Sequence, residues 1–142
     1  MPRGDRISPD GSGRLFGGYG RNAQLIQGGS WDPTTVEVAV RALRELEDPP
    51  TAVFAANDSL AFRAIGVLHL AGRHVPDDVA VVGFDDIPLA HEMVPPLTTV
   101  RIPLTDIGRR VAARLLELIE SRGAAHAVSD LMPAELVLRS TA

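Results

Sequence analysis

The 142-residue sequence contains no lysine and no cysteine. Because all 14 basic residues are arginine, the chain lacks the lysine that a P-loop phosphate site or a pyridoxal Schiff base requires. The absence of cysteine excludes disulfides, thiolate catalysis and cysteine-ligated metals. No two of the four histidines have the i, i+4 spacing of a helical metal site, so the sequence predicts no metal and no cofactor.

Long apolar runs and an excess of positive charge are also missing. No run of about 18 apolar residues occurs, so we expect no membrane span and no membrane partner. The N-terminal residues lack the apolar stretch of a secretory signal, which predicts a cytoplasmic location. The formal net charge is −4, and phosphate backbones attract basic surfaces. We therefore expect no DNA binding by this chain alone.

Short apolar runs alternate with helical patterns after residues 1–22, which show no periodicity and are expected to be irregular. The runs that predict strands lie at residues 23–28, 51–56, 79–84 and 97–102. The helical patterns lie at residues 33–47, 57–72 and 105–122, and two short strands are expected near 127–131 and 135–139. This order predicts an α/β fold with a doubly wound parallel sheet, because parallel strands need helical crossovers.

Polar or aromatic side chains follow three of the predicted strands. In open parallel sheets, ligands bind beyond the carboxyl ends of the strands, where Trp31, Asn57 and Asp85 are expected. We expect Asp58 and Asp86 to cap the helices that follow, which leaves Asn57 and Asp85 to face a ligand. Asp85 would then accept hydrogen bonds from a pair of hydroxyl groups. Mg²⁺ binding or acid/base catalysis by the paired carboxylates is the alternative.

The remaining sequence features give only weak evidence for a binding or catalytic site. A lone tryptophan is more often a core or boundary residue, so Trp31 is open to both interpretations. No G-x-S-x-G motif is present, and the glycines at 17–20 follow no predicted strand, as a dinucleotide fingerprint would require. We therefore expect that the protein is not an enzyme.

Three sequence blocks carry a family resemblance. FAANDSLA (54–61), VPDDVAVVGFDDI (75–87) and PPLTTVRIP (95–103) resemble, in order and spacing, the sensor domain of the lactose-repressor/galactose-repressor (LacI/GalR) family of transcription regulators. The tail LMPAELVLRST (131–141) is similar to the closing strand of that domain. The similarity is close over residues 50–142 and looser over 14–47. The helix-turn-helix of the family and most of its first sensor subdomain have no counterpart in this sequence.

The resemblance implies a periplasmic-binding-protein-like (type I) fold, represented here by its C-terminal subdomain. It implies an effector such as a sugar, a nucleoside or another small polar metabolite, and it transfers the effector contacts to Arg14, Trp31, Asn57 and Asp85. It also implies a homodimer with Phe62 and Met93 at the interface. A small-molecule-binding protein of the same fold that is unrelated to transcription is the alternative.

The resemblance also divides the chain into four parts. These are an irregular segment (1–22), the core of the sensor subdomain (23–102), a crossover helix that packs on the other subdomain in the family (103–126), and returning strands (127–142). The crossover helix has an apolar stripe that includes Leu115 and Leu118. We expect this stripe to pair with a second chain, because the family's partner for it has no counterpart here.

Overall fold

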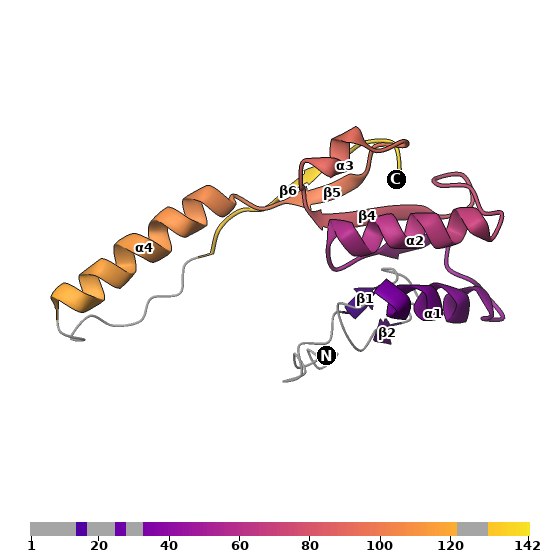
Figure 1. Ribbon diagram of the computed structural model, residues 1–142, viewed down its shortest axis with the longest axis horizontal. Helices are drawn as coiled ribbons and strands as arrows, with labels where there is room; N and C mark the ends of the chain where they lie inside the picture. The colour runs from indigo at the N-terminus through magenta and orange to yellow at the C-terminus, as the bar shows by residue number, and fades with distance from the viewer. Residues whose placement is uncertain (1–13, 17–24, 28–32, 122–130) are drawn as a thin grey trace.

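The computed structural model describes residues 14–16, 25–27, 33–121 and 131–142 (Figure 1). The strands are β1 (Arg14–Phe16), β2 (Leu25–Gln27), β3 (Ala52–Phe54), β4 (Ala80–Asp85), β5 (Thr98–Arg101) and β6 (Glu135–Val137). The helices are α1 (Pro33–Arg44), α2 (Asp58–Leu70), α3 (Leu89–Glu92) and α4 (Leu104–Glu120).

The strands form one mixed sheet in the order β2-β1-β3-β4-β5-β6. The three central strands β3, β4 and β5 are parallel, whereas β1 runs antiparallel to both of its neighbours and β6 runs antiparallel to β5. An α/β fold with a mostly parallel sheet is therefore confirmed. The helical crossovers between parallel strands explain why alternating patterns in the sequence predicted it.

One strand near the start of the chain was not predicted. The segment 1–22 was expected to be mostly irregular, and residues 14–16 form β1 within it; only two of these residues are apolar and glycines stand on both sides, so no apolar run marks the strand. The rest of that segment lies outside the described residues. Of the two strands expected near the end of the chain, β6 is confirmed, and the one expected near 127–131 lies outside the described residues except for Leu131.

Helix α2 is defined at both ends by local hydrogen bonds. Asn57 precedes it in an extended conformation and accepts a hydrogen bond from the backbone of Leu60. After the helix, Gly72 has a φ of +72°, its N–H donates to His69, and the N–H of Arg73 donates to Leu68. This pattern is a Schellman motif, which confirms Gly72 as the residue that ends the helix.

The core lies between the sheet and the pair α1 and α2, which run side by side (Figure 1). Helix α2 buries the four residues expected on its inner face, which are Ala61, Ala64, Ile65 and Leu68. Helix α1 contributes Val36, Val40 and Leu43, and the sheet contributes Val53, Val81 and Leu97. Small residues on α2 allow close packing against β4 and α1, so the start of α2 is held firmly at the end of β3.

Helix α4 extends away from the sheet (Figure 1). It confirms the helix expected over 105–122, but none of its residues is buried, and Val111 is 62% exposed. Leu115, Leu116 and Ile119 are also more than half exposed. The apolar stripe of α4 is therefore uncovered in the described part of the chain. Neither α4 nor any other described helix is both long enough and apolar enough to cross a membrane.

The close approach of α2 to β4 gives a stability prediction. A Cβ atom at Gly83 would collide with the carboxylate of Asp58 and come within 2.9 Å of Cδ2 of Leu97. We expect Gly83→Ala to lower the free energy of unfolding by about 1–3 kcal/mol, measured by urea denaturation. Gly66→Ala is the matched control, because no atom lies within 4 Å of its added methyl group. The control should keep or raise stability, since alanine favours helices by about 1 kcal/mol over glycine. Equal effects at both positions would contradict the packing described here.

The exposed stripe of α4 gives a second prediction, for the 142-residue chain in solution. We expect the double variant Leu115→Glu/Leu118→Glu to reduce the oligomer size seen by light scattering, because it removes exposed apolar surface that we expect to associate between chains. The midpoint of thermal unfolding should stay within a few degrees of the original, since α4 contributes nothing to the buried core. A variant that unfolds as a monomer would show instead that α4 packs within its own domain.

Candidate functional site

The carboxyl ends of β3, β4 and β5 meet at one edge of the sheet. Because these strands are parallel neighbours, Asn57 and Asp58 after β3 lie beside the end of β4, where Asp85 is the last residue. Asp85 in turn pairs in register with Arg101, the last residue of β5. The structure thus brings together two of the predicted site residues, Asn57 and Asp85, at the edge where ligands bind in such sheets.

Asn57 caps α2, a role that was predicted for Asp58. The Oδ1 atom of Asn57 accepts from the backbone N of Leu60 at 2.8 Å, which is the N-cap hydrogen bond. The prediction was one residue out because the backbone is still extended at Asn57 and helical from Asp58 onwards. The side-chain Nδ2 of Asn57 has no acceptor among the described residues, so it can donate to a ligand.

Asp58 is fully buried and links three elements. Its Oδ1 accepts from Oγ1 of Thr99 in β5 at 2.5 Å. Its Oδ2 accepts from the backbone N of Ile87, which follows β4, at 2.8 Å. A buried carboxylate is costly unless hydrogen bonds satisfy it, and here one donor faces each oxygen. Asp58 therefore joins the start of α2 to Thr99 in β5 and to the backbone that follows β4.

Asp85 and Asp86 form a strained turn at the end of β4. Their φ angles are +106° and +54°, in the left-handed region where residues other than glycine are uncommon. Such conformations cost about 1–3 kcal/mol each and persist only where the surrounding structure enforces them. The turn gives Asp85 and Asp86 different environments, although they are adjacent in the sequence.

The carboxylate of Asp85 is half-buried and has no hydrogen-bond donor among the described residues. Burial raises its pKa above the usual value, and the nearby negative charge of Asp58 raises the pKa further. Both effects disfavour the ionised carboxylate in the free protein. A ligand that donates hydrogen bonds at this point would relieve them, so the arrangement suits a donor such as a hydroxyl group.

Asp86 does not cap a helix, contrary to prediction. Helix α3 begins only at Leu89, and Pro88 precedes it without a side-chain capping bond. Asp86 instead accepts from Nη2 of Arg139 and from Nε of Arg101, each at 2.6 Å. Its burial opposes ionisation, but the hydrogen bonds from Arg139 and Arg101 outweigh that effect and lower its pKa. Asp86 is therefore a structural anion that ties the turn to β5 and to the segment after β6.

This pairing bears on the alternative of a metal or acid/base site. Asp86 is engaged by two arginines, so the two adjacent carboxylates do not converge on a common point. Among residues 33–121 and 131–142, no cluster of three or more metal-ligating side chains occurs. The described part of the edge is suited to hydrogen bonding a polar molecule rather than to chemistry on it.

The structure describes the other two predicted effector contacts, Arg14 and Trp31, only in part. Arg14 starts β1, and because β1 runs antiparallel to β3, its backbone lies toward the carboxyl end of β3. Arg14 also pairs in register with Gln27, so β2 ends at the same edge. Trp31 follows β2 but lies outside the described residues, as does the side chain of Arg14. Their contribution to the site stays a prediction.

Sequence reasoning missed Arg101 and Arg139. Arg101 is the last residue of β5 and the second to last of the run that predicted this strand, so the same strand-end argument that selected Asp85 applies to it. Arg139 also donates to the carbonyl of Leu97 at 2.7 Å, and only the tertiary fold brings it there. No local signal in the sequence distinguishes Arg139 from a surface arginine.

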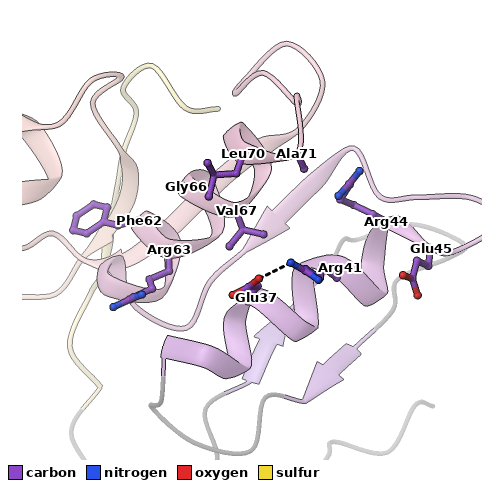
Figure 2. Close-up of a pocket in the computed structure, with 10 residues that line it drawn as sticks. All are labelled: Glu37, Arg41, Arg44, Glu45, Phe62, Arg63, Gly66, Val67, Leu70 and Ala71. Carbon is purple, nitrogen blue, oxygen red and sulfur yellow. Dashed lines mark hydrogen bonds and ion pairs between the residues drawn. The ribbon is translucent and has the colours of Figure 1, made fainter.

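Two grooves lie on the outer faces of the helices, away from this edge. One, of about 770 Å³, runs between α1 and α2 and is lined by charged side chains such as the Glu37–Arg41 pair (Figure 2). The other, of about 420 Å³, has both Phe62 and Met93 in its wall. Phe62 is half-buried against the core and lines both grooves.

Known proteins share this sequence pattern and this fold. Residues 18–142 match the family described as the periplasmic binding protein-like domain. The chain is 37% identical over 117 residues to the HTH-type transcriptional repressor PurR of Vibrio atlanticus, a match that covers 82% of this chain and 35% of the relative. The chain thus spans little more than a third of the length of that relative.

Solved structures give the same result. A transcriptional regulator CelR–cellobiose complex has a TM-score of 0.73 and 34% identity, covering 80% of this chain and 34% of the other. A LacI family transcriptional regulator from Enterococcus faecalis V583 with bound ribose has a TM-score of 0.70 and 30% identity, covering 79% and 41%. These relatives are transcription regulators and not enzymes. This chain belongs to the periplasmic binding protein-like domain family, and within it to the effector-binding domains of LacI/GalR regulators.

Proposed function

We propose that this chain binds a small polar effector, such as a sugar or nucleoside, as the sensor of a transcription regulator. Asp85 carries the proposal, because its half-buried carboxylate lacks a donor among the described residues and stands beside Asn57 at the ligand-binding edge. The sugars bound to related regulators support a hydroxyl-rich ligand. Arg14 and Trp31 would complete the site from the same edge.

The alternative is a binding protein of the same fold that is unrelated to transcription. The relatives favour a role in a transcription regulator, because they are themselves repressors or regulators of transcription. A bacterial regulator of this kind acts in the cytoplasm, where its operator DNA lies.

The effector site can be tested with variants that leave the fold intact. Asn57→Ser keeps a capping oxygen for α2 but removes the amide donor, and Asp85→Asn removes the charge at nearly constant volume. A thermal-shift screen with ribose, cellobiose, sucrose and nucleosides would first identify a ligand, since binding raises the unfolding temperature. Calorimetric titration with that ligand should then show affinities reduced about 5- to 150-fold in each variant, which corresponds to ~1–3 kcal/mol.

Asp106→Asn on the exposed face of α4 is the control and should bind like the original protein. Unchanged affinity in both site variants would place the ligand elsewhere and refute the proposed site.

We further propose that the chain forms a homodimer through the groove that contains Phe62 and Met93. Both residues are half-buried, and each packs against the core while one side faces this groove. A second copy that covers the groove would bury apolar surface on α2 and on the loop after α3.

The dimer proposal predicts that Phe62→Glu yields a smaller species in sedimentation analysis, because a charge buried at the interface has no partner. Val38→Glu on α1 is the matched control, since Val38 is equally apolar, is exposed and lines neither groove. To keep α4 from contributing to association, both variants should carry Leu115→Glu and Leu118→Glu. An unchanged oligomer in the Phe62 variant would exclude this interface.

A further inference from the structure

We propose that Asp58 is a positioning residue for the effector contact at Asp85, an inference that rests on the proposed function. The structure joins Asp58 to Asp85 through one hydrogen bond, from the backbone N of Ile87 to Oδ2 of Asp58 at 2.8 Å. Ile87 lies only two residues after Asp85, so this bond fixes the far end of the strained turn. Asp58 itself is fully buried and cannot contact a ligand in solution.

The turn needs such a restraint because two consecutive residues, Asp85 and Asp86, have left-handed φ angles. Neither residue prefers that conformation, and it persists only when neighbouring structure enforces it. On one side, the arginines at 101 and 139 hold Asp86. On the other side, Asp58 holds the N–H of Ile87. With both restraints in place, the carboxylate of Asp85 is fixed at the strand end before any ligand arrives, which reduces the entropy lost on binding.

The hydrogen bonds of Asp58 show how the turn is held. One oxygen accepts from the hydroxyl of Thr99 and the other from the N–H of Ile87, and the amide of Ile87 can only donate. An asparagine could keep both bonds, because the hydroxyl of Thr99 can accept from its NH₂ group, whereas an alanine removes both. The absence of a side chain at Gly83 leaves the space that the carboxylate occupies. The negative charge of Asp58 also contributes to the raised pKa of Asp85.

The test compares Asp58→Ala with Thr99→Val, which loses only the other hydrogen bond of the same carboxylate. Both variants should unfold at a lower temperature, because each leaves a buried group unpaired. Only Asp58→Ala should release the turn, because it removes the acceptor for the N–H of Ile87. We expect hydrogen exchange at the Ile87 amide to become at least about tenfold faster in Asp58→Ala and to change little in Thr99→Val. Equal exchange rates in the two variants would overturn the proposal.

Ligand affinity gives the second measurement. For the sugar or nucleoside found by the thermal-shift screen, Asp58→Ala should bind about tenfold more weakly than the original protein. The double variant Asp58→Ala/Asp85→Asn should bind no more weakly than Asp85→Asn alone, because Asp58 acts through Asp85. Additive losses would show that Asp58 affects binding by another route and would refute the positioning role.

The outcomes separate the two proposals. If Asp85→Asn binds normally, the proposed effector site fails, while the Ile87 exchange still tests whether Asp58 holds the turn. If Asp85→Asn loses affinity but Asp58→Ala does not, only the positioning role fails. Asp58→Ser is the second variant should Asp58→Ala not fold, since serine is compatible with a helix start and lacks the Oδ2 atom that accepts from Ile87. Its expected results are the same.

Discussion

A single buried carboxylate joins three elements at the edge of the sheet that is proposed to bind the effector. The parallel strands β3, β4 and β5 are paired by backbone hydrogen bonds. Asp58 adds a side-chain link from the start of α2 to Thr99 within β5 and to the backbone of Ile87 after β4. The cost of burying a charge is offset only because both oxygens receive hydrogen bonds. This arrangement holds the turn after Asp85, and it needs the space that Gly83 leaves by having no side chain.

Periodic patterns in the sequence were enough to predict the fold, because the core is built from them. The apolar positions of α2 recur at helical spacing, and the four expected on its inner face are buried. Strand β1 was not predicted because it has only two apolar residues and glycines on both sides, so no apolar run marks it. The end of α2 was predictable because Gly72 adopts a positive φ, which glycine tolerates better than other residues.

The sequence predicted where the candidate site residues lie, but it did not predict which residues they form hydrogen bonds with. The strand-end rule selected Asn57 and Asp85 correctly as neighbours, but it assigned capping roles to Asp58 and Asp86 that neither has. Capping preference is a local property, whereas the actual partners of these carboxylates lie 41 residues away for Asp58 and 53 residues away for Asp86. A hydrogen bond between such distant residues follows from the tertiary fold, which no local pattern encodes. The burial of Asp58 could not be predicted from the sequence, because only the tertiary fold places the donor Thr99 beside it.

Helix α2 connects two surfaces of the domain. Asn57 caps its first turn at the edge proposed to bind the effector, and Phe62 follows on the same helix, in the wall of both grooves. The inner face of the helix is packed against the core, so a displacement of its first turn would be carried along the helix to Phe62. A ligand that shifts α2 also shifts the surface proposed for the dimer. Thermodynamic reciprocity then requires that dimerisation change ligand affinity by the same factor by which the ligand changes dimer affinity.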